Sequence, residues 1–127
     1  MRLIIVRHAK AAPGEPDELR PLTAEGRDAA RGIGARLAEL KPDAVVASPL
    51  LRTRETAAAI AEAAGLEVQV DERLAPGATA AGVRAAAEGK GETVITVGHQ
   101  PDCSEIVLEL TGEEVNFPVG ATYEVEL

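Results

Sequence analysis

The sequence predicts an α/β fold, a three-layer sandwich in which helices cover both faces of a mostly parallel central sheet. Three observations lead to this prediction. The chain has 127 residues, enough for one domain with its own core. It contains several short apolar runs, and stretches with the apolar spacing of helices lie between them. Short connections join these segments, as in layered α/β proteins, so we expect a single domain spanning residues 1–127.

The apolar runs predict five strands. Residues 3–6, 44–47 and 94–97 are continuous runs rich in valine and isoleucine, which is typical of strands buried on both faces of a parallel sheet. Residues 68–70 and 122–127 instead alternate between apolar and polar side chains. Alternation indicates that one face of the strand is in water. We therefore expect these two strands at the edges of the sheet.

Two helices are predicted in the first half of the chain. The first begins at Thr23, a suitable N-cap, and its apolar residues repeat at helical spacing as far as Leu40. The second is predicted to be capped by Ser48, with Pro49 at its first position, and to end at Gly65. Both helices lie between predicted strands, as a parallel sheet requires.

Two further helices are predicted in the second half. A weaker pattern covers residues 79–88, and the last helix follows Pro101 and ends at Gly112. The segment 11–21 is rich in proline, glycine and acidic residues, and we expect it to be a loop after the first strand.

Composition excludes several classes of protein. A net charge of −8 and an aromatic content of 2% argue against a general binder of nucleic acid or of an anionic membrane. The one cysteine allows no internal disulfide, which fits a reducing compartment. The apolar run near the N-terminus is shorter than a secretory core or a membrane span. We expect a cytoplasmic protein without nucleic-acid or membrane partners.

The residues that follow the central strands predict a site for a phosphoryl group. Ligands of parallel α/β sheets bind beyond the carboxyl ends of the strands. The chain has two histidines, His8 and His99, and each comes directly after a central strand, while Arg7 and Arg52 lie at the same end. Arginine offers planar donors that match phosphate oxygens, and a neutral imidazole is a competent nucleophile. This combination favours a functional site over two structural histidines.

Four motifs resemble those of the histidine phosphatase superfamily, in the family's order and spacing. They are Arg7-His8-Ala9, Leu22-Thr23-x-x-Gly26, Ser48-Pro49-x-x-Arg52 and Gly98-His99-x-Pro101. The chain is most similar to the small phosphohistidine phosphatase branch, the SixA type, which also carries a segment like Arg-Pro-Leu-Thr at residues 20–23. The resemblance implies the phosphoglycerate mutase-like version of the α/β sandwich.

The resemblance also implies roles for individual residues. His8 would attack phosphorus and become a transient phosphohistidine, which water then hydrolyses. Arg7, Arg52 and His99 would bind the phosphoryl oxygens, and Arg20 is a further substrate-binding candidate at the mouth of the pocket. The reaction would need no metal ion and no other cofactor, and the two isolated histidines do not favour a metal hydrolase.

Two departures from the family pattern bear on the substrate. Ala9 replaces the usual glycine after the histidine, and Ala75 stands where many members carry a glutamate that serves as general acid. Without a strong acid, an alkoxide leaving group is penalised more than the imidazole of phosphohistidine. Asp71 and Glu72 remain alternative acids.

We therefore expect a metal-independent phosphatase that acts on phosphohistidine in a partner protein. A broad phosphomonoesterase for small phosphate esters is one alternative, and a module that binds phosphorylated side chains without turnover is another. Cys103 is a further candidate nucleophile near a helix N-terminus. Because it shares a helical face with Ile106 and Leu110, we predict that it packs in the core.

Overall fold

The structure is a computed structural model that describes residues 1–127. At its centre lies a five-stranded sheet. Its strands are, in chain order, β1 (Arg2–Arg7), β2 (Ala44–Ala47), β3 (Val68–Val70), β4 (Thr93–Gly98) and β5 (Thr122–Glu126). They lie in the order β3-β2-β4-β1-β5, and only β5 is antiparallel to its neighbour. The predicted mostly parallel sheet is confirmed, and the two strands with alternating sequences are its edges.

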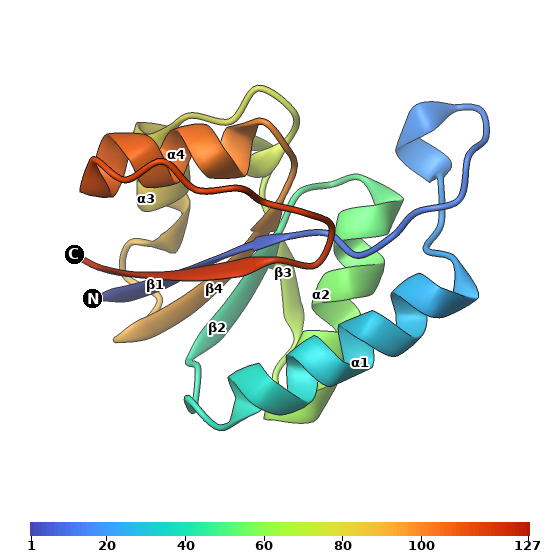
Figure 1. Cartoon of the computed structure of the whole chain (residues 1–127). Helices are drawn as coiled ribbons and strands as arrows, with labels where there is room; N and C mark the ends of the chain where they lie inside the picture. Colours follow the sequence, from blue (N-terminus) through green and yellow to red (C-terminus); the bar gives the residue numbers. More distant parts are fainter.

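Four α-helices cover the sheet, two on each face (Figure 1). They are α1 (Ala24–Ala38), α2 (Leu51–Ala64), α3 (Ala80–Ala87) and α4 (Asp102–Thr111). Two short 3₁₀ helices, η1 (Asp17–Leu19) and η2 (Glu72–Leu74), lie in the loops that follow β1 and β3. The alternation of strands and helices is the predicted one. None of the helices is long and apolar enough to cross a membrane.

The sheet separates two hydrophobic cores, and β1 contributes side chains to both. Leu3 and Ile5 contact the core on the side of α3 and α4, whereas Ile4 and Val6 contact the core on the side of α1 and α2. Successive side chains of a strand point to opposite faces of the sheet. A strand between two layers of helices is therefore apolar at every position, which explains the continuous apolar run.

Most of the predicted helix ends are confirmed. The hydroxyl of Thr23 accepts a hydrogen bond from the backbone N–H of Gly26 at 2.9 Å, as expected of an N-cap. Gly65 and Gly112 end α2 and α4 with φ angles of 71° and 80°. These angles lie in the left-handed region, which glycine enters without the steric cost that a side chain would add.

The predicted cap of the second helix is wrong. The helix α2 begins at Leu51, and its N-cap position, Leu50, makes no side-chain hydrogen bond to the helix end. The hydroxyl of Ser48 lies 2.8 Å from Nε2 of His99 and accepts only a 3.3 Å bond from the N–H of Leu50. A serine before a helix is a suitable cap by pattern, but α2 begins three residues beyond Ser48, and the serine hydroxyl accepts only from Leu50, which lies outside the helix.

The carboxyl ends of the central strands meet at one edge of the sheet. Arg7 at the end of β1 pairs with Gly98 at the end of β4. Beyond the strands, the N–H of His8 donates to the carbonyl of Gly98, and the N–H of Ser48 donates to the carbonyl of Val97, both at 3.1 Å. Backbone hydrogen bonds therefore continue past the strand ends and hold the following residues in position.

The two ends of the chain lie together at the amino end of β1, opposite the carboxyl ends of the central strands (Figure 1). The amino group of Met1 donates to the carbonyl of Leu127 at 3.1 Å, and the N–H of Leu127 donates to the carbonyl of Met1 at 2.8 Å. This arrangement follows from the topology, because β1 starts at this end of the sheet and the antiparallel β5 finishes there.

Candidate active site

A pocket of about 320 Å³ lies at the carboxyl edge of the sheet. All five predicted site residues line it, namely Arg7, His8, Arg20, Arg52 and His99. The other lining residues are Lys10, Ala11, Pro76, Gln100 and Val119, which sequence reasoning did not single out. Lys10 and Gln100 follow the two histidines closely in the chain, and this closeness is the sequence feature that could have placed them in the pocket.

His8 is oriented by the carbonyl oxygen of the next residue. Its Nδ1 lies 2.7 Å from the oxygen of Ala9. Because a carbonyl oxygen only accepts hydrogen bonds, Nδ1 carries the hydrogen, and Nε2 of the neutral ring keeps a free lone pair. Sequence reasoning left this acceptor open, since backbone geometry decides it.

The surroundings keep His8 neutral near pH 7. The side chain is 8% exposed, and burial is the largest cause that lowers its pKa below 6.5. The positive charges of Arg52, Arg7 and Arg20 lower the pKa further, against the opposing effect of the hydrogen bond to Ala9. The neutral ring has the lone pair that a nucleophile needs.

Thr56 on α2 supports the residue that orients His8. Its hydroxyl accepts a hydrogen bond from the N–H of Ala9 at 3.1 Å and donates to the carbonyl of Arg52 at 2.8 Å. Thr56 is fully buried and Ala9 is almost fully buried. The first turns of α2 therefore hold both an arginine of the pocket and the backbone beside His8.

His99 lies beside His8, with 5.6 Å between the ring centroids. Its Nε2 is 2.8 Å from the hydroxyl of Ser48, while its Nδ1 is buried and has no hydrogen-bond partner. Burial, followed by the charge of Arg52, lowers the pKa of His99 to about 4. This ring is therefore also neutral near pH 7.

Arg7 presents a second buried group without a partner. Its Nη1 donates to the carbonyl of Phe117 at 2.8 Å, which fixes the guanidinium, but its buried Nε has no acceptor. A buried N–H without a partner is costly, and an anionic oxygen would satisfy it. Together with Nδ1 of His99, this unpaired nitrogen is what a phosphoryl binding site would contain.

Asp17, which sequence reasoning missed, links the other two arginines of the pocket. Its carboxylate accepts from Nη1 of Arg20 at 3.0 Å and from Nη2 of Arg52 at 3.2 Å. Its carbonyl oxygen accepts from Nη1 of Arg52 at 3.0 Å. The hydrogen bond from Arg20, then that from Arg52, holds the pKa of Asp17 below its usual range. Asp17 is not one of the residues that line the pocket, so its contact with the pocket runs through the two arginines that it holds.

The structure brings neither candidate acid into the pocket. Asp71 pairs with Arg73 at 2.8 Å, and this contact holds the pKa of Asp71 below its usual range. Glu72 lines a separate depression beside η2. No residue that lines the pocket is an aspartate or a glutamate. Nor do any three His, Cys, Asp or Glu side chains lie together in a way that could hold a metal ion.

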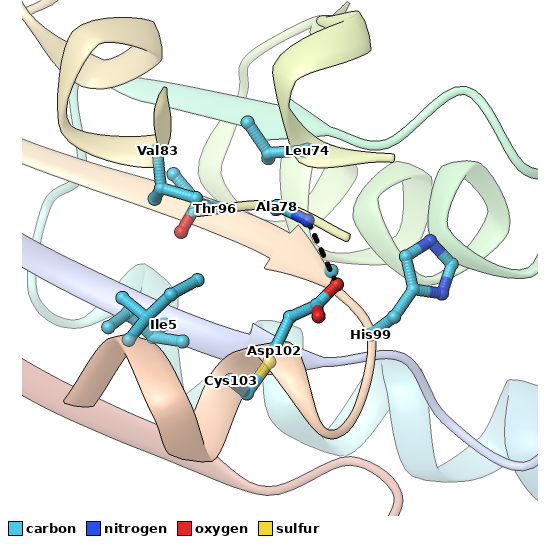
Figure 2. A pocket seen from close by; sticks show the side chains of 10 residues that line it. Ile5, Leu74, Ala78, Val83, Thr96, His99, Asp102 and Cys103 are labelled. Atoms are coloured by element: carbon cyan, nitrogen blue, oxygen red, sulfur yellow. Dashed lines mark hydrogen bonds between the residues drawn. The ribbon is translucent and has the colours of Figure 1, made fainter. Parts of the chain in front are cut away.

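A second, much smaller cavity lies between the sheet, α3 and α4 (Figure 2). Its volume of about 10 Å³ is too small for a substrate. Asp102 accepts hydrogen bonds there from the N–H groups of Gly77 and Ala78, at 2.9 and 3.2 Å, and so anchors the segment after Pro76 of the main pocket.

Cys103 is 2% exposed, and burial raises its thiol pKa to about 12, so the prediction that it packs in the core is confirmed.

The chain matches a known protein family. Residues 3–76 match the family model described as "Histidine phosphatase superfamily (branch 1)". An uncharacterised protein of Picosynechococcus sp. is 35% identical over 131 residues, which cover 92% of this chain and 79% of that protein. A probable phosphoglycerate mutase of Serratia proteamaculans is 40% identical over 81 residues, which cover 58% of this chain and only 37% of the mutase.

Solved structures agree with these matches. The protein histidine phosphatase SixA, in a complex with tungstate, has a TM-score of 0.88 and 30% identity, with 100% of this chain and 88% of that chain covered. A putative phosphohistidine phosphatase SixA from Agrobacterium tumefaciens has a TM-score of 0.82 and 28% identity, with 97% and 89% covered. These similarities confirm the family resemblance and the fold that the motifs indicated.

Proposed function

The chain belongs to the histidine phosphatase superfamily, and we propose that it hydrolyses phosphohistidine in a partner protein through a covalent intermediate on His8. Membership of the family and similarity to SixA structures support phosphatase activity. The chemical surroundings of His8 support the finer assignment. The lone pair on Nε2 belongs to a neutral ring, and the ring is held by the carbonyl of Ala9.

The reaction would proceed in two displacements at phosphorus. In the first, Nε2 of His8 forms a bond to phosphorus while the bond to the substrate nitrogen breaks. The departing imidazole leaves as a neutral ring after taking a proton from solvent. In the second, water attacks the phosphoryl group on His8, inorganic phosphate leaves, and Nε2 recovers its lone pair. The arginines and His99 would hold the phosphoryl oxygens throughout, and each such donor is worth about 10²–10³ in rate.

The observation that carries the choice of substrate is the absence of a carboxylic acid from the pocket lining. An alkoxide leaving group needs a proton from an acid as its bond breaks. An imidazole leaves readily once its ring is protonated, which solvent can accomplish. The pocket therefore suits the P–N bond of phosphohistidine better than the P–O bond of an alkyl phosphate.

A phosphomonoesterase for small phosphate esters is the second candidate. The match to a probable phosphoglycerate mutase favours it, although that match covers 58% of this chain and 37% of the mutase. The two candidates differ in the acid that they require, so a comparison of leaving groups separates them.

The test measures phosphate release from a phosphohistidine-bearing carrier protein and from a sugar phosphate, in the presence of EDTA. We expect faster turnover of the carrier protein, no turnover by His8→Ala, and unchanged turnover by Arg73→Gln, whose side chain pairs with Asp71 outside the pocket. Faster hydrolysis of the sugar phosphate would refute the substrate assignment. Binding of the carrier without release would instead indicate a module that reads phosphorylated side chains.

A further inference from the structure

Ser48 contacts the second histidine of the pocket without lining the pocket itself. It follows the end of β2, is fully buried, and lies with its hydroxyl oxygen 2.8 Å from Nε2 of His99. The hydroxyl makes one other contact, a hydrogen bond that it accepts from the N–H of Leu50 at 3.3 Å. The role of this serine is therefore decided by the direction of its hydrogen bond to His99.

The hydroxyl of Ser48 is the donor in this contact. It has one hydrogen to donate, and Nε2 of His99 is its only acceptor, since Leu50 offers an N–H. If His99 donated instead, two N–H groups would point at the same oxygen and the hydroxyl hydrogen would have no acceptor in a fully buried position. Such an unmade bond is costly. Nε2 of His99 therefore accepts, and the hydrogen of its neutral ring lies on Nδ1.

The two imidazoles consequently offer opposite groups to a ligand. Both carry their hydrogen on Nδ1, but His8 uses it on the carbonyl of Ala9 and leaves the lone pair of Nε2 free. His99 uses its Nε2 lone pair on Ser48 and leaves its Nδ1–H buried without a partner. The lone pair of His8 can attack a phosphorus atom, whereas the N–H of His99 can donate a hydrogen bond to a phosphoryl oxygen.

We propose that Ser48 is a positioning residue that holds His99 in the tautomer whose Nδ1–H donates to a phosphoryl oxygen. Without the serine hydroxyl, nothing holds the hydrogen on Nδ1, and the ring becomes a mixture of tautomers. The tautomer with a lone pair on Nδ1 repels a phosphoryl oxygen. The effect on catalysis rests on the proposed function, whereas the tautomer itself does not.

The test reads the tautomer of His99 directly, by ¹⁵N NMR of histidine-labelled protein at neutral pH. The variants are Ser48→Ala and, as a matched control, Thr53→Val. Thr53 is also fully buried, and the carbonyls of Ser48 and Leu50, at 2.9 and 2.7 Å, share its one hydroxyl hydrogen. The control therefore removes a buried hydroxyl from the first turn of α2, close to Ser48, without removing a contact to His99.

In the wild type we expect the hydrogen of His99 on Nδ1. Ser48→Ala should shift it partly to Nε2 and lower kcat/KM about tenfold, the effect of losing one hydrogen bond to a charged group. Thr53→Val should keep the wild-type tautomer. A hydrogen on Nε2 in the wild type would overturn the proposal without any variant, and so would an unchanged tautomer in Ser48→Ala. Absence of phosphatase activity from the wild type would refute the proposed function but leave the NMR result to decide the tautomer.

Discussion

Replacing Arg52 by lysine tests whether the planar guanidinium, and not only its charge, is needed in the pocket. A guanidinium has five N–H donors. Two of those of Arg52 go to Asp17, to its carbonyl at 3.0 Å and its carboxylate at 3.2 Å, which leaves three for a ligand. A lysine carries its donors on one nitrogen, so it can keep the contact with Asp17 or reach a phosphoryl group, but not both.

The expected cost of Arg52→Lys is that of one lost transition-state donor, about 3–4 kcal/mol or 10²–10³ in kcat/KM. Arg54→Lys is the matched control, because Arg54 lies on the same helix, is exposed, and donates to the carbonyl of Pro49 outside the pocket. Steady-state phosphate release from a phosphohistidine protein measures both variants. A kcat/KM for Arg52→Lys within about threefold of the control would refute the reasoning.

As the pH falls, kcat/KM should begin to drop only below pH 6.5, because burial lowers the pKa of His8 and so keeps the ring neutral to a lower pH. A drop that begins above pH 6.5 would contradict this. Thr56→Val should leave the N–H of Ala9 unpaired and lower the free energy of unfolding by about 1–3 kcal/mol, measured by urea denaturation. Asp17→Asn should raise KM by up to about fivefold, because one amide oxygen cannot serve both arginines, whereas Glu18→Gln in the same 3₁₀ helix should not change it. Equal KM values for the two variants would rule out this role.

The elements of the fold were predictable because their signals are local. A strand between two layers of helices must be apolar throughout, and residues 3–6 carry that signal openly. The positions of His8 and His99 after such strands were also readable, since parallel strands end at the same edge of a sheet. The pocket formed by these residues agrees with that reasoning.

The contacts that orient the site were not predictable, because they depend on backbone groups and on distant side chains. The acceptor for His8 is a main-chain oxygen of Ala9, which no side-chain pattern indicates. Asp17 lies in an acidic loop where nothing distinguishes it from its neighbours until the fold brings it to the arginines. Ser48 carried a signal that fitted a helix cap, but its hydroxyl contacts His99, which follows β4, and does not reach the end of α2.

The pairing of the chain ends has a practical consequence for attachments. The strand β1 has six residues, so it separates the ends from the pocket by roughly 20 Å of extended backbone. A tag or a fused domain joined to either Met1 or Leu127 leaves from the side of the sheet opposite the pocket. Because the two ends are hydrogen-bonded to each other, a short linker between them would close the chain into a ring. New termini could then be opened in a surface loop without disturbing the central strands.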